Sequence, residues 1–207
     1  MGMSEYSLKL PRMKAALKRT FDIICSALGL LFLWWLILLA ALVARLDTGL
    51  SGFFTQQRVG RNGRLFKVIK IRTMKPVENL VTTVTTDHDA RITAAGRFFR
   101  KTKIDELPQL INVLLGDMSF VGPRPDVPGF ADQLVGEERS VLSIRPGITG
   151  PATLHYRDEE RLLASVDDPE RYNREVIFPE KVKINLDYIR NYSLTNDLKY
   201  IVRTIIG

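Results

Sequence analysis

Two neighbouring acids, Asp105 and Glu106, stand where the sequence predicts the start of a short helix. Pro108 is tolerated in a first helical turn, and Gly116 is typical of the residue that follows a helix. A helix N-terminus attracts anions because its N–H groups are free and its dipole is positive there. An aspartate at such a place is a nucleophile, a metal ligand or simply a cap, with Glu106 supporting the dipole. Spacing alone leaves these roles open.

Two arginines lie in rigid, proline-containing turns near these acids in the sequence. Arg124 stands between two prolines in the segment 122–125, and Arg145 begins the segment 145–150. Their forked donors fit phosphate oxygens. A carboxylate that approaches a diphosphate meets a repulsion of about 4 kcal/mol per close like-charged pair at moderate dielectric. Attack by Asp105 on phosphorus therefore requires Mg²⁺ and arginines to neutralise the phosphate.

The elements that position these residues begin with a basic, apolar N-terminal third. Residues 1–75 carry 13 Lys or Arg and 3 Asp or Glu, a balance of +10, whereas residues 76–207 carry 17 and 20, a balance of −3. This distribution argues against a nucleic-acid-binding domain, whose charge would lie on a folded face, and favours a membrane surface. The single cysteine excludes an intramolecular disulfide framework.

A membrane helix is predicted within this third. Residues 23–44 contain no charge, and 13 of these 22 residues are Leu, Ile, Val or Phe. Such a composition favours insertion by about 4–8 kcal/mol, and the run spans ~33 Å as a helix. Lysines and arginines flank it on both sides, and the positive-inside rule would hold both flanks in the cytoplasm. The sequence is compatible with a helix that crosses the membrane and with a re-entrant helix, which enters and returns on the same side. We favour the re-entrant form.

The rest of the chain reads as short elements. Residues 53–59 and 65–71 are β-prone runs around Asn62-Gly63, which predicts a hairpin. Residues 76–90 read as a polar loop, in which His88 between two aspartates is more simply solvated than metal-bound.

Helical segments are expected farther along the chain. Arg91 to Lys103 reads as a basic helix with Ile92, Phe98 and Phe99 facing inward. The charged stretch 157–174 reads as a solvated helix and loop. Two terminal helices are expected around 184–189 and 198–206. The sequence carries no P-loop, dinucleotide-binding glycine motif or Cys/His metal spacing.

The block from Asp105 to Pro125, which reads DELPQL, NVL and GDMSFVGPRP, resembles the bacterial sugar transferase family. These are small monotopic phosphoglycosyl transferases that start polyprenol-linked glycan assembly. Further similar segments are KRTFD at 18–22, QRVG at 57–60, FKV at 66–68, RIT at 91–93, GRF at 96–98 and RPGITG at 145–150. The resemblance covers residues 14–206.

The resemblance implies an α+β, mostly helical fold. It comprises a basic N-terminal segment at 1–20, a re-entrant membrane helix at 21–46 and a compact cytoplasmic catalytic domain with a small β-hairpin at 47–207. The implied location is the cytoplasmic face of a bacterial inner membrane, on an anionic leaflet. The implied partners are a UDP-sugar and polyprenyl phosphate, with no nucleic acid; a homodimer is compatible with the resemblance.

The implied reaction begins when Asp105 attacks the β-phosphate of a UDP-sugar and UMP leaves. Polyprenyl (undecaprenyl) phosphate then attacks the aspartyl phosphosugar. Asp105 and Glu106 are the implied catalytic dyad and Mg²⁺ ligands, and Arg124 is the implied phosphate-binding arginine. By position and charge we add to the phosphate-binding set Arg145, Arg157 and Lys70.

Two departures from the family pattern bear on these expectations. Members commonly carry Ser-Pro midway along the membrane helix, where this chain has Trp34-Trp35, so no proline supplies a kink. Residues 151–157 also differ from the common pattern, which leaves the sugar unidentified; His155 in this stretch is a further candidate base. The alternative function is a catalytically silent membrane adaptor, which would have no chemical need for the Asp105-Glu106 pair.

Overall fold

The computed structural model describes residues 8–76 and 89–206, and within them the fold is mostly helical. A two-stranded antiparallel hairpin and a two-stranded parallel pair lie among the helices. The elements are α1 Arg12–Thr48, β1 Phe53–Val59, β2 Leu65–Ile71, α2 Ala94–Thr102, α3 Gln109–Leu115, β3 Ser119–Val121, β4 Gly147–Thr149, α4 Pro151–His155, α5 Glu159–Ala164, α6 Pro169–Tyr172, α7 Phe178–Arg190 and α8 Leu194–Ile206. The expected mostly helical fold with a small hairpin is confirmed.

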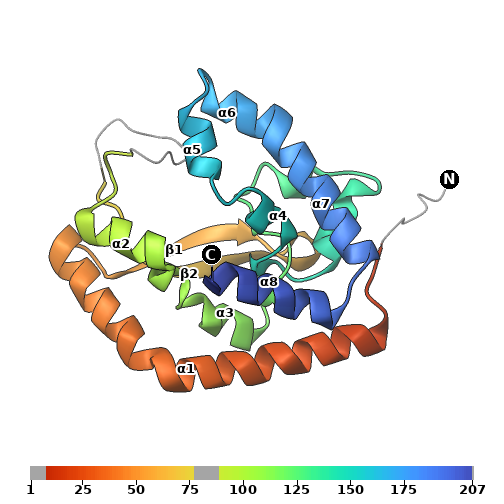
Figure 1. The fold of residues 1–207 in the computed structure, drawn as a ribbon, viewed down its shortest axis with the longest axis horizontal. Helices are drawn as coiled ribbons and strands as arrows, with labels where there is room; N and C mark the ends of the chain where they lie inside the picture. The colour runs from red at the N-terminus through yellow and green to blue at the C-terminus, as the bar shows by residue number, and fades with distance from the viewer. Residues whose placement is uncertain (1–7, 77–88, 207) are drawn as a thin grey trace.

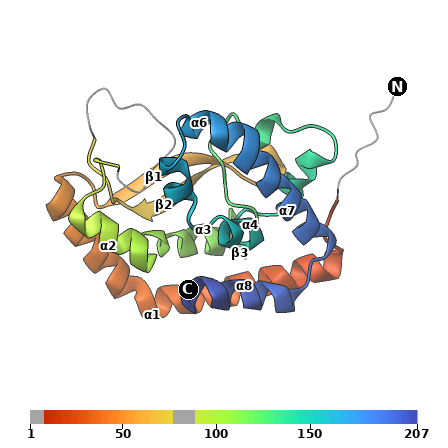
Figure 2. The ribbon, with the colours of Figure 1, turned by 45° about the horizontal axis from the view of Figure 1, so that its top comes forward.

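The helices form layers around the hairpin. The long helix α1 runs along one side of the molecule, with α8, α3 and α2 beside it, and the hairpin lies above them (Figure 2). Helices α5 to α7 cover the opposite side of the hairpin (Figure 2). One apolar core forms where the last third of α1, through Ile37, Ala41 and Ala44, packs against Ile71 of β2 and Phe99 of α2.

Helix α1 begins at Arg12, within the segment 1–20 that the sequence analysis set apart as a basic lead-in. The basic residues from Arg12 onward and the apolar run form one continuous helix of 37 residues, which extends beyond both ends of the predicted membrane segment 21–46. The bounds of that membrane segment stay a prediction. By length and composition α1 is the one helix among residues 8–76 and 89–206 that is apolar enough to cross a membrane. It ends at Gly49, whose left-handed φ of 73° suits a residue without a Cβ.

The ribbon of α1 is bent near its middle, and its concave side faces α3 (Figure 1). Ser26 supplies one cause, because its hydroxyl donates to the carbonyl of Asp22 at 2.6 Å, a back-bond that bends helices. Gly29 supplies the second: a Cβ there would lie 3.0 Å from Cδ1 of Leu110 in α3. The bend thus arises without the proline that the family pattern would place in the helix.

One buried ion pair and a set of hydrogen bonds attach the first half of α1 to the body. Nζ of Lys18 lies 2.6 Å from Oδ2 of Asp197 in α8, and both side chains are almost fully buried. The hydroxyl of Tyr188 donates to the other oxygen of Asp197 at 2.7 Å. One turn farther along α1, the Asp22 carboxylate accepts hydrogen bonds from the backbone and hydroxyl at the start of β3.

The hairpin has the bounds that the sequence predicts. Phe53 pairs with Ile71 at one end and Val59 with Leu65 at the other. In the connecting turn Asn62 is left-handed with a φ of 58°, a conformation that asparagine tolerates. In the part of the chain that the structure describes, no strand pairs with the outer edge of β2.

Asn112 of α3 occupies that outer edge. Its Oδ1 accepts from the N–H of Ile69 and its Nδ2 donates to the carbonyl of Lys67. This amide takes the place of a neighbouring strand and fixes the position of Lys70, which lies next along β2.

Three expectations about the helices are corrected. Helix α2 begins at Ala94, after a Thr93 cap, rather than at Arg91. Phe99 and Ile92 are buried as expected, but Phe98 is 57% exposed on the side of α2 that faces away from the core. The charged stretch 157–174 is more helical than expected, because it contains α5 and α6. His88 and most of the predicted 76–90 loop lie outside the described residues.

Candidate active site

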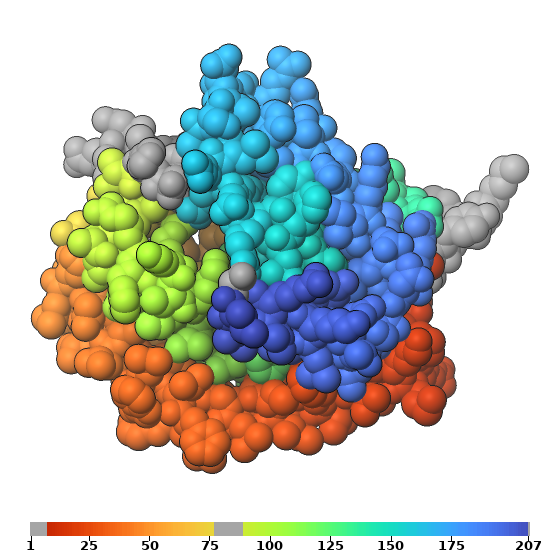
Figure 3. All heavy atoms as spheres, in the orientation of Figure 1, coloured from red at the N-terminus to blue at the C-terminus, as the bar shows by residue number. Residues whose placement is uncertain are grey.

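A cavity of about 1190 Å³ lies between the hairpin, α2 and the layer of α5 to α7. In the space-filling view a hollow opens between the lime-coloured α2 and the cyan segment that carries α5 (Figure 3). Asp105, Glu106, Arg124 and Lys70 all line this cavity. Four of the predicted site residues, which come from three separate parts of the sequence, are therefore brought together.

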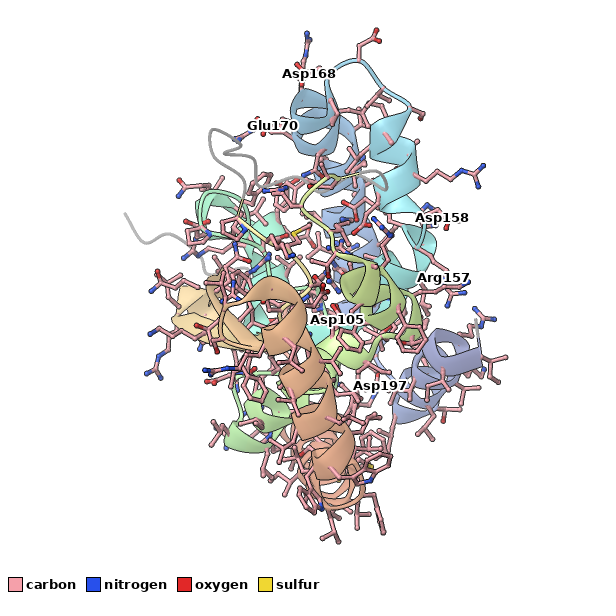
Figure 4. The ribbon with its side chains drawn as sticks, turned by 90° about the vertical axis from the view of Figure 1, so that its left-hand side faces the viewer. Asp105, Arg157, Asp158, Asp168, Glu170 and Asp197 are labelled. Carbon is pink, nitrogen blue, oxygen red and sulfur yellow. The ribbon has the colours of Figure 1, made fainter. Side chains whose placement is uncertain are left out.

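A single 3-10 turn, Ile104–Glu106, presents the two acids. Only Lys103 separates this turn from the end of α2. Lys103 has a left-handed φ of 59°, a strained conformation for a lysine. Helix α3 follows after Pro108, so the acids precede a helix N-terminus as the sequence predicts. The side chain of Asp105 lies in the interior of the molecule, where the ribbons converge (Figure 4).

Glu106 is held by two cations. Its Oε1 accepts from Nη2 of Arg124 at 2.8 Å and from Nζ of Lys70 at 3.1 Å. Burial alone would raise the pKa of Glu106, but the charges of Arg124, Lys70 and Lys103 outweigh burial and hold that pKa well below its usual range. Glu106 is therefore an anion at neutral pH. This contact places Lys70 beside Glu106 rather than free on the surface.

Asp105 has the opposite environment. Asp105 is 8% exposed, and within residues 8–76 and 89–206 its buried Oδ1 has no hydrogen-bond partner. Burial, followed by the neighbouring charge of Glu106, raises the pKa of Asp105 to about 6. At neutral pH Asp105 is thus a poorly solvated carboxylate with a free oxygen, which is the state a nucleophile needs. The plain capping role left open by the sequence is disfavoured, because Asp105 caps no helix in the structure.

The pair also fits a magnesium ion that is shared with a substrate. Within residues 8–76 and 89–206 no three acidic, histidine or cysteine side chains converge on a metal site. Asp105 keeps a free Oδ1, and Oε2 of Glu106 accepts no hydrogen bond from a described residue. Mg²⁺ is commonly bound by one or two carboxylates together with substrate phosphates and water, and this donor set meets that requirement.

One of the nominated arginines, Arg145, has a structural contact instead. Nε of Arg145 donates to the carbonyl of Gly116 at 2.7 Å, and Arg19 donates to the carbonyls of Val113 and Leu114. Together they cap the C-terminus of α3, and Arg145 does not line the cavity. The structure therefore does not bring Arg145 into the cavity, and its place in the phosphate-binding set stays a prediction.

Arg157 and His155 lie at the edge of the cavity or outside it. Arg157 lines the rim but donates to the carbonyl of Arg203 near the end of α8, and Figure 4 shows it well away from Asp105. His155 does not line the cavity. Its Nε2 lies 3.5 Å from Glu180, and the imidazole is 57% exposed. The structure does not bring this candidate base to Asp105.

Other residues of the cavity were not anticipated. On one side α2 contributes Arg97, Arg100 and Lys101. On the other side Asp126 faces the charges of Arg58 and Lys181, and burial raises its pKa to about 6 despite them. The basic character of α2 was visible in the sequence, but no local signal joins α7 to Asp126, because their proximity depends on the tertiary fold.

Comparison with known proteins gives consistent matches. A family profile described as bacterial sugar transferase matches residues 13–207. An Escherichia coli K12 protein named UDP-glucose:undecaprenyl-phosphate glucose-1-phosphate transferase is 36% identical over 97% of this chain. A Caulobacter vibrioides protein of the same name is 36% identical over 95% of the chain. A Rhizobium leguminosarum exopolysaccharide production protein is 36% identical over 94%.

The extent of these matches differs. The chain spans 42% of the Escherichia coli relative, 71% of the Caulobacter relative and 96% of the Rhizobium relative. The profile match covers every residue that lines the cavity and all of α1 except Arg12, and the Rhizobium match covers almost the whole length of both chains. The chain belongs to the bacterial sugar transferase family.

Proposed function

We propose that the protein transfers a sugar 1-phosphate from a UDP-sugar to polyprenyl phosphate and releases UMP. The observation that carries this proposal is the buried, unpartnered Oδ1 of Asp105 beside a Glu106 that is neutralised by Arg124 and Lys70. Relatives named for glucose-1-phosphate transfer to undecaprenyl phosphate support the reaction class. The product would be the first lipid-linked intermediate of a glycan.

The chemistry proceeds in two balanced displacements. Asp105 attacks the β-phosphorus, the bond from that phosphorus to the bridging oxygen breaks, and UMP leaves with the electron pair. An oxygen of polyprenyl phosphate then attacks the same phosphorus, and the acyl phosphate bond breaks to return the Asp105 carboxylate. Arg124, whose guanidinium is partly exposed to the cavity, is placed to hold phosphate oxygens in both steps.

Mg²⁺ would neutralise the diphosphate against the approaching carboxylate. Asp105 and Glu106 are its proposed protein ligands, with phosphate oxygens completing the set. The cationic side chains of the cavity have two further roles. Lys70 and Arg124 keep Glu106 ionised, so that two carboxylates would be available to the metal. The basic side chains of α2 raise the local concentration of anionic substrates.

The membrane arrangement that we propose is re-entrant. Both ends of the apolar run contact the same body: Lys18 pairs with α8, and Ala44 packs in the core shared with β2 and α2. A helix that crossed the bilayer would carry one of these ends to the other side. Between them, the side chains of Leu31, Phe32 and Trp35 are more than half exposed, as expected for a segment that dips into lipid.

Helices beside α1 present further apolar side chains. Leu198, Val202 and Ile205 occupy one face of α8 and are exposed, as is Leu115 at the end of α3. Since α8 and α3 lie in the same layer as α1 (Figure 2), these side chains suit contact with the membrane surface. The cytoplasmic face follows from the basic flanks of α1.

The experiment that tests the function is a UMP-release screen of UDP-sugars with a C55 polyprenyl phosphate acceptor. Wild-type protein should release UMP from at least one donor, whereas Asp105→Asn should release none. Full activity of Asp105→Asn would remove the nucleophile assignment. Absence of UMP release from every donor would favour the adaptor alternative.

The re-entrant arrangement has its own test. Single cysteines placed before Arg12 and after Gly49 should both react with a membrane-impermeant thiol reagent only when the cytoplasmic face is open. Labelling of the two sites from opposite faces would show that the helix crosses.

A further inference from the structure

The cavity that contains Asp105 has a second polar side, which is formed by the turn after Arg124 and by one face of α7. Asp126 follows Arg124 by two residues and lines the cavity. From α7, Lys181 and Asn185 line it as well, one helical turn apart on the same face. We call Asp126, Lys181 and Asn185 the α7 wall. The proposed chemistry at Asp105 makes no use of it.

Two members of the α7 wall have acceptor atoms without donors. Asn185 is 7% exposed, and its buried Oδ1 has no hydrogen-bond partner among the described residues. Buried polar atoms are bonded in the great majority of cases, so an orphaned amide oxygen on a cavity wall indicates a donor that is supplied from outside the protein. Among the described residues, no hydrogen bond reaches the carboxylate of Asp126 either.

The charges differ between the two sides of the cavity. The α2 side presents Arg97, Lys101 and Lys103, for which no ion pair is formed among the described residues. On the α7 side, Lys181 is paired with Glu159 at 2.6 Å, and Arg58 faces Asp126, so that positive and negative charges balance. Phosphates require an excess of cations, whereas hydroxyl groups require carboxylate and amide acceptors.

The position of the wall indicates which hydroxyl groups it meets. In a UDP-sugar the sugar is bonded directly to the phosphate that Asp105 attacks, while the ribose is one phosphate farther away. Asp126 adjoins Arg124, whose guanidinium lies 2.8 Å from Glu106 and therefore beside the reacting phosphorus. The nearer, hydroxyl-rich group is the transferred sugar.

We propose that Asp126 and Asn185 bind hydroxyl groups of the transferred sugar and thereby select among UDP-sugars. This inference rests on the proposed function. The uridine part then lies toward the cationic α2 side, and the α7 wall contributes to donor choice rather than to phosphate binding. Discrimination of this kind is strong, because a donor with a misplaced hydroxyl leaves a buried acceptor unpaired.

The test uses Asp126→Asn and Asn185→Leu in the full chain. Asp126→Asn preserves shape and removes the charged acceptor. Asn185→Leu keeps the number and branching of the side-chain heavy atoms and removes an orphaned buried oxygen, so the fold should be retained; melting temperature in detergent verifies this. Asp187→Asn is the control, since Asp187 is an exposed acid of α7 that does not line the cavity. Each protein is assayed for kcat/KM with a panel of UDP-hexoses, and for the Kd of each UDP-hexose and of UDP.

We expect Asp126→Asn and Asn185→Leu to lower kcat/KM for the preferred donor by about 10- to 100-fold, the range of one hydrogen bond to a charged or buried group. The preference over the epimeric donor should narrow, and the Kd of UDP should change less than twofold. Asp187→Asn should match wild type. A parallel loss of UDP affinity would assign the wall to the uridine part and overturn the proposal, as would an unchanged donor preference.

Failure of the proposed function is a separate result. If the wild type releases UMP from no donor, the transferase assignment fails. The comparison of Kd values for UDP-hexoses with that for UDP then still decides whether the α7 wall contacts a sugar, because it does not depend on turnover.

Discussion

Replacing Asp105 by asparagine should stabilise the folded protein while it abolishes activity. In the fold the pKa of Asp105 is raised from 3.8 to about 6, first by burial and then by Glu106. Folding therefore disfavours the ionised form. At pH 7.5, where Asp105 is ionised in both states, this difference corresponds to a destabilisation of about 3 kcal/mol, at about 1.4 kcal/mol per pH unit. Asp105→Asn removes that cost.

The sign of the pH dependence follows from the raised pKa. The cost is fully present above pH 6, declines as the pH falls from 6 toward 3.8, and is well under 1 kcal/mol at pH 4. The stabilisation by Asp105→Asn should decline in the same way. For a chain of this size, about 3 kcal/mol corresponds to an increase of about 6–12 °C in melting temperature.

The assay is unfolding in detergent micelles with EDTA present, so that no metal contributes to the charge balance. Glu106→Gln is the matched comparison and should have the opposite effect. It leaves Arg124 and Lys70 without their shared anion and should destabilise by about 1–3 kcal/mol. Equal or lower stability of Asp105→Asn at pH 7.5, or a gain that persists unchanged at pH 4, would refute this reasoning.

Three further outcomes are expected. Lys18→Met should lower the free energy of unfolding by about 3–5 kcal/mol, because it leaves Asp197 as an unpaired buried charge. The double variant with Asp197→Leu should recover most of that loss. Thermal melts of both proteins measure the two effects, and no recovery in the double variant would contradict the pairing. Arg124→Ala should reduce kcat/KM by at least about 100-fold. Arg145→Ala should instead lower the melting temperature with little change in KM. A large increase in KM for Arg145→Ala would show that Arg145 does bind phosphate. EDTA should stop UMP release and added Mg²⁺ should restore it, and metal-independent turnover would contradict the proposed Mg²⁺ site.

The sequence alone predicted the hairpin and the position of the two acids before a helix, because both depend on residues that are close together in the chain. The hairpin has the predicted bounds because Asn62 and Gly63 supply the positive φ angles of its turn between two β-prone runs. Asp105 and Glu106 precede a helix as expected, because Pro108 and Gly116 delimit it. The family resemblance, rather than spacing, distinguished a nucleophile from a cap.

The roles of the two arginines and the pairing of β3 with β4 could not be predicted from the sequence, because they depend on contacts between distant parts of the chain. Arg145 and Arg124 look alike in sequence, each beside a proline, but one caps α3 and the other reaches Glu106. The parallel pairing of β3 and β4 joins two three-residue strands, which are too short to show a periodic pattern.

The sequence of α1 has no proline that would explain a bend. The structure attributes it to Ser26 and to the close approach of Leu110 at Gly29. Such a contact between α1 and α3 is invisible to any reading of the apolar run alone, because the partner lies far along the chain.

The most direct test of the central claim is mass spectrometry of the protein after incubation with its UDP-sugar and Mg²⁺, in the absence of polyprenyl phosphate. One sugar-phosphate adduct is expected on the peptide that contains Asp105, formed with release of UMP and discharged when polyprenyl phosphate is added. Asp105→Asn should carry no adduct. An adduct on another residue, or UMP release that begins only with the acceptor present and leaves the protein unmodified, would contradict the covalent mechanism.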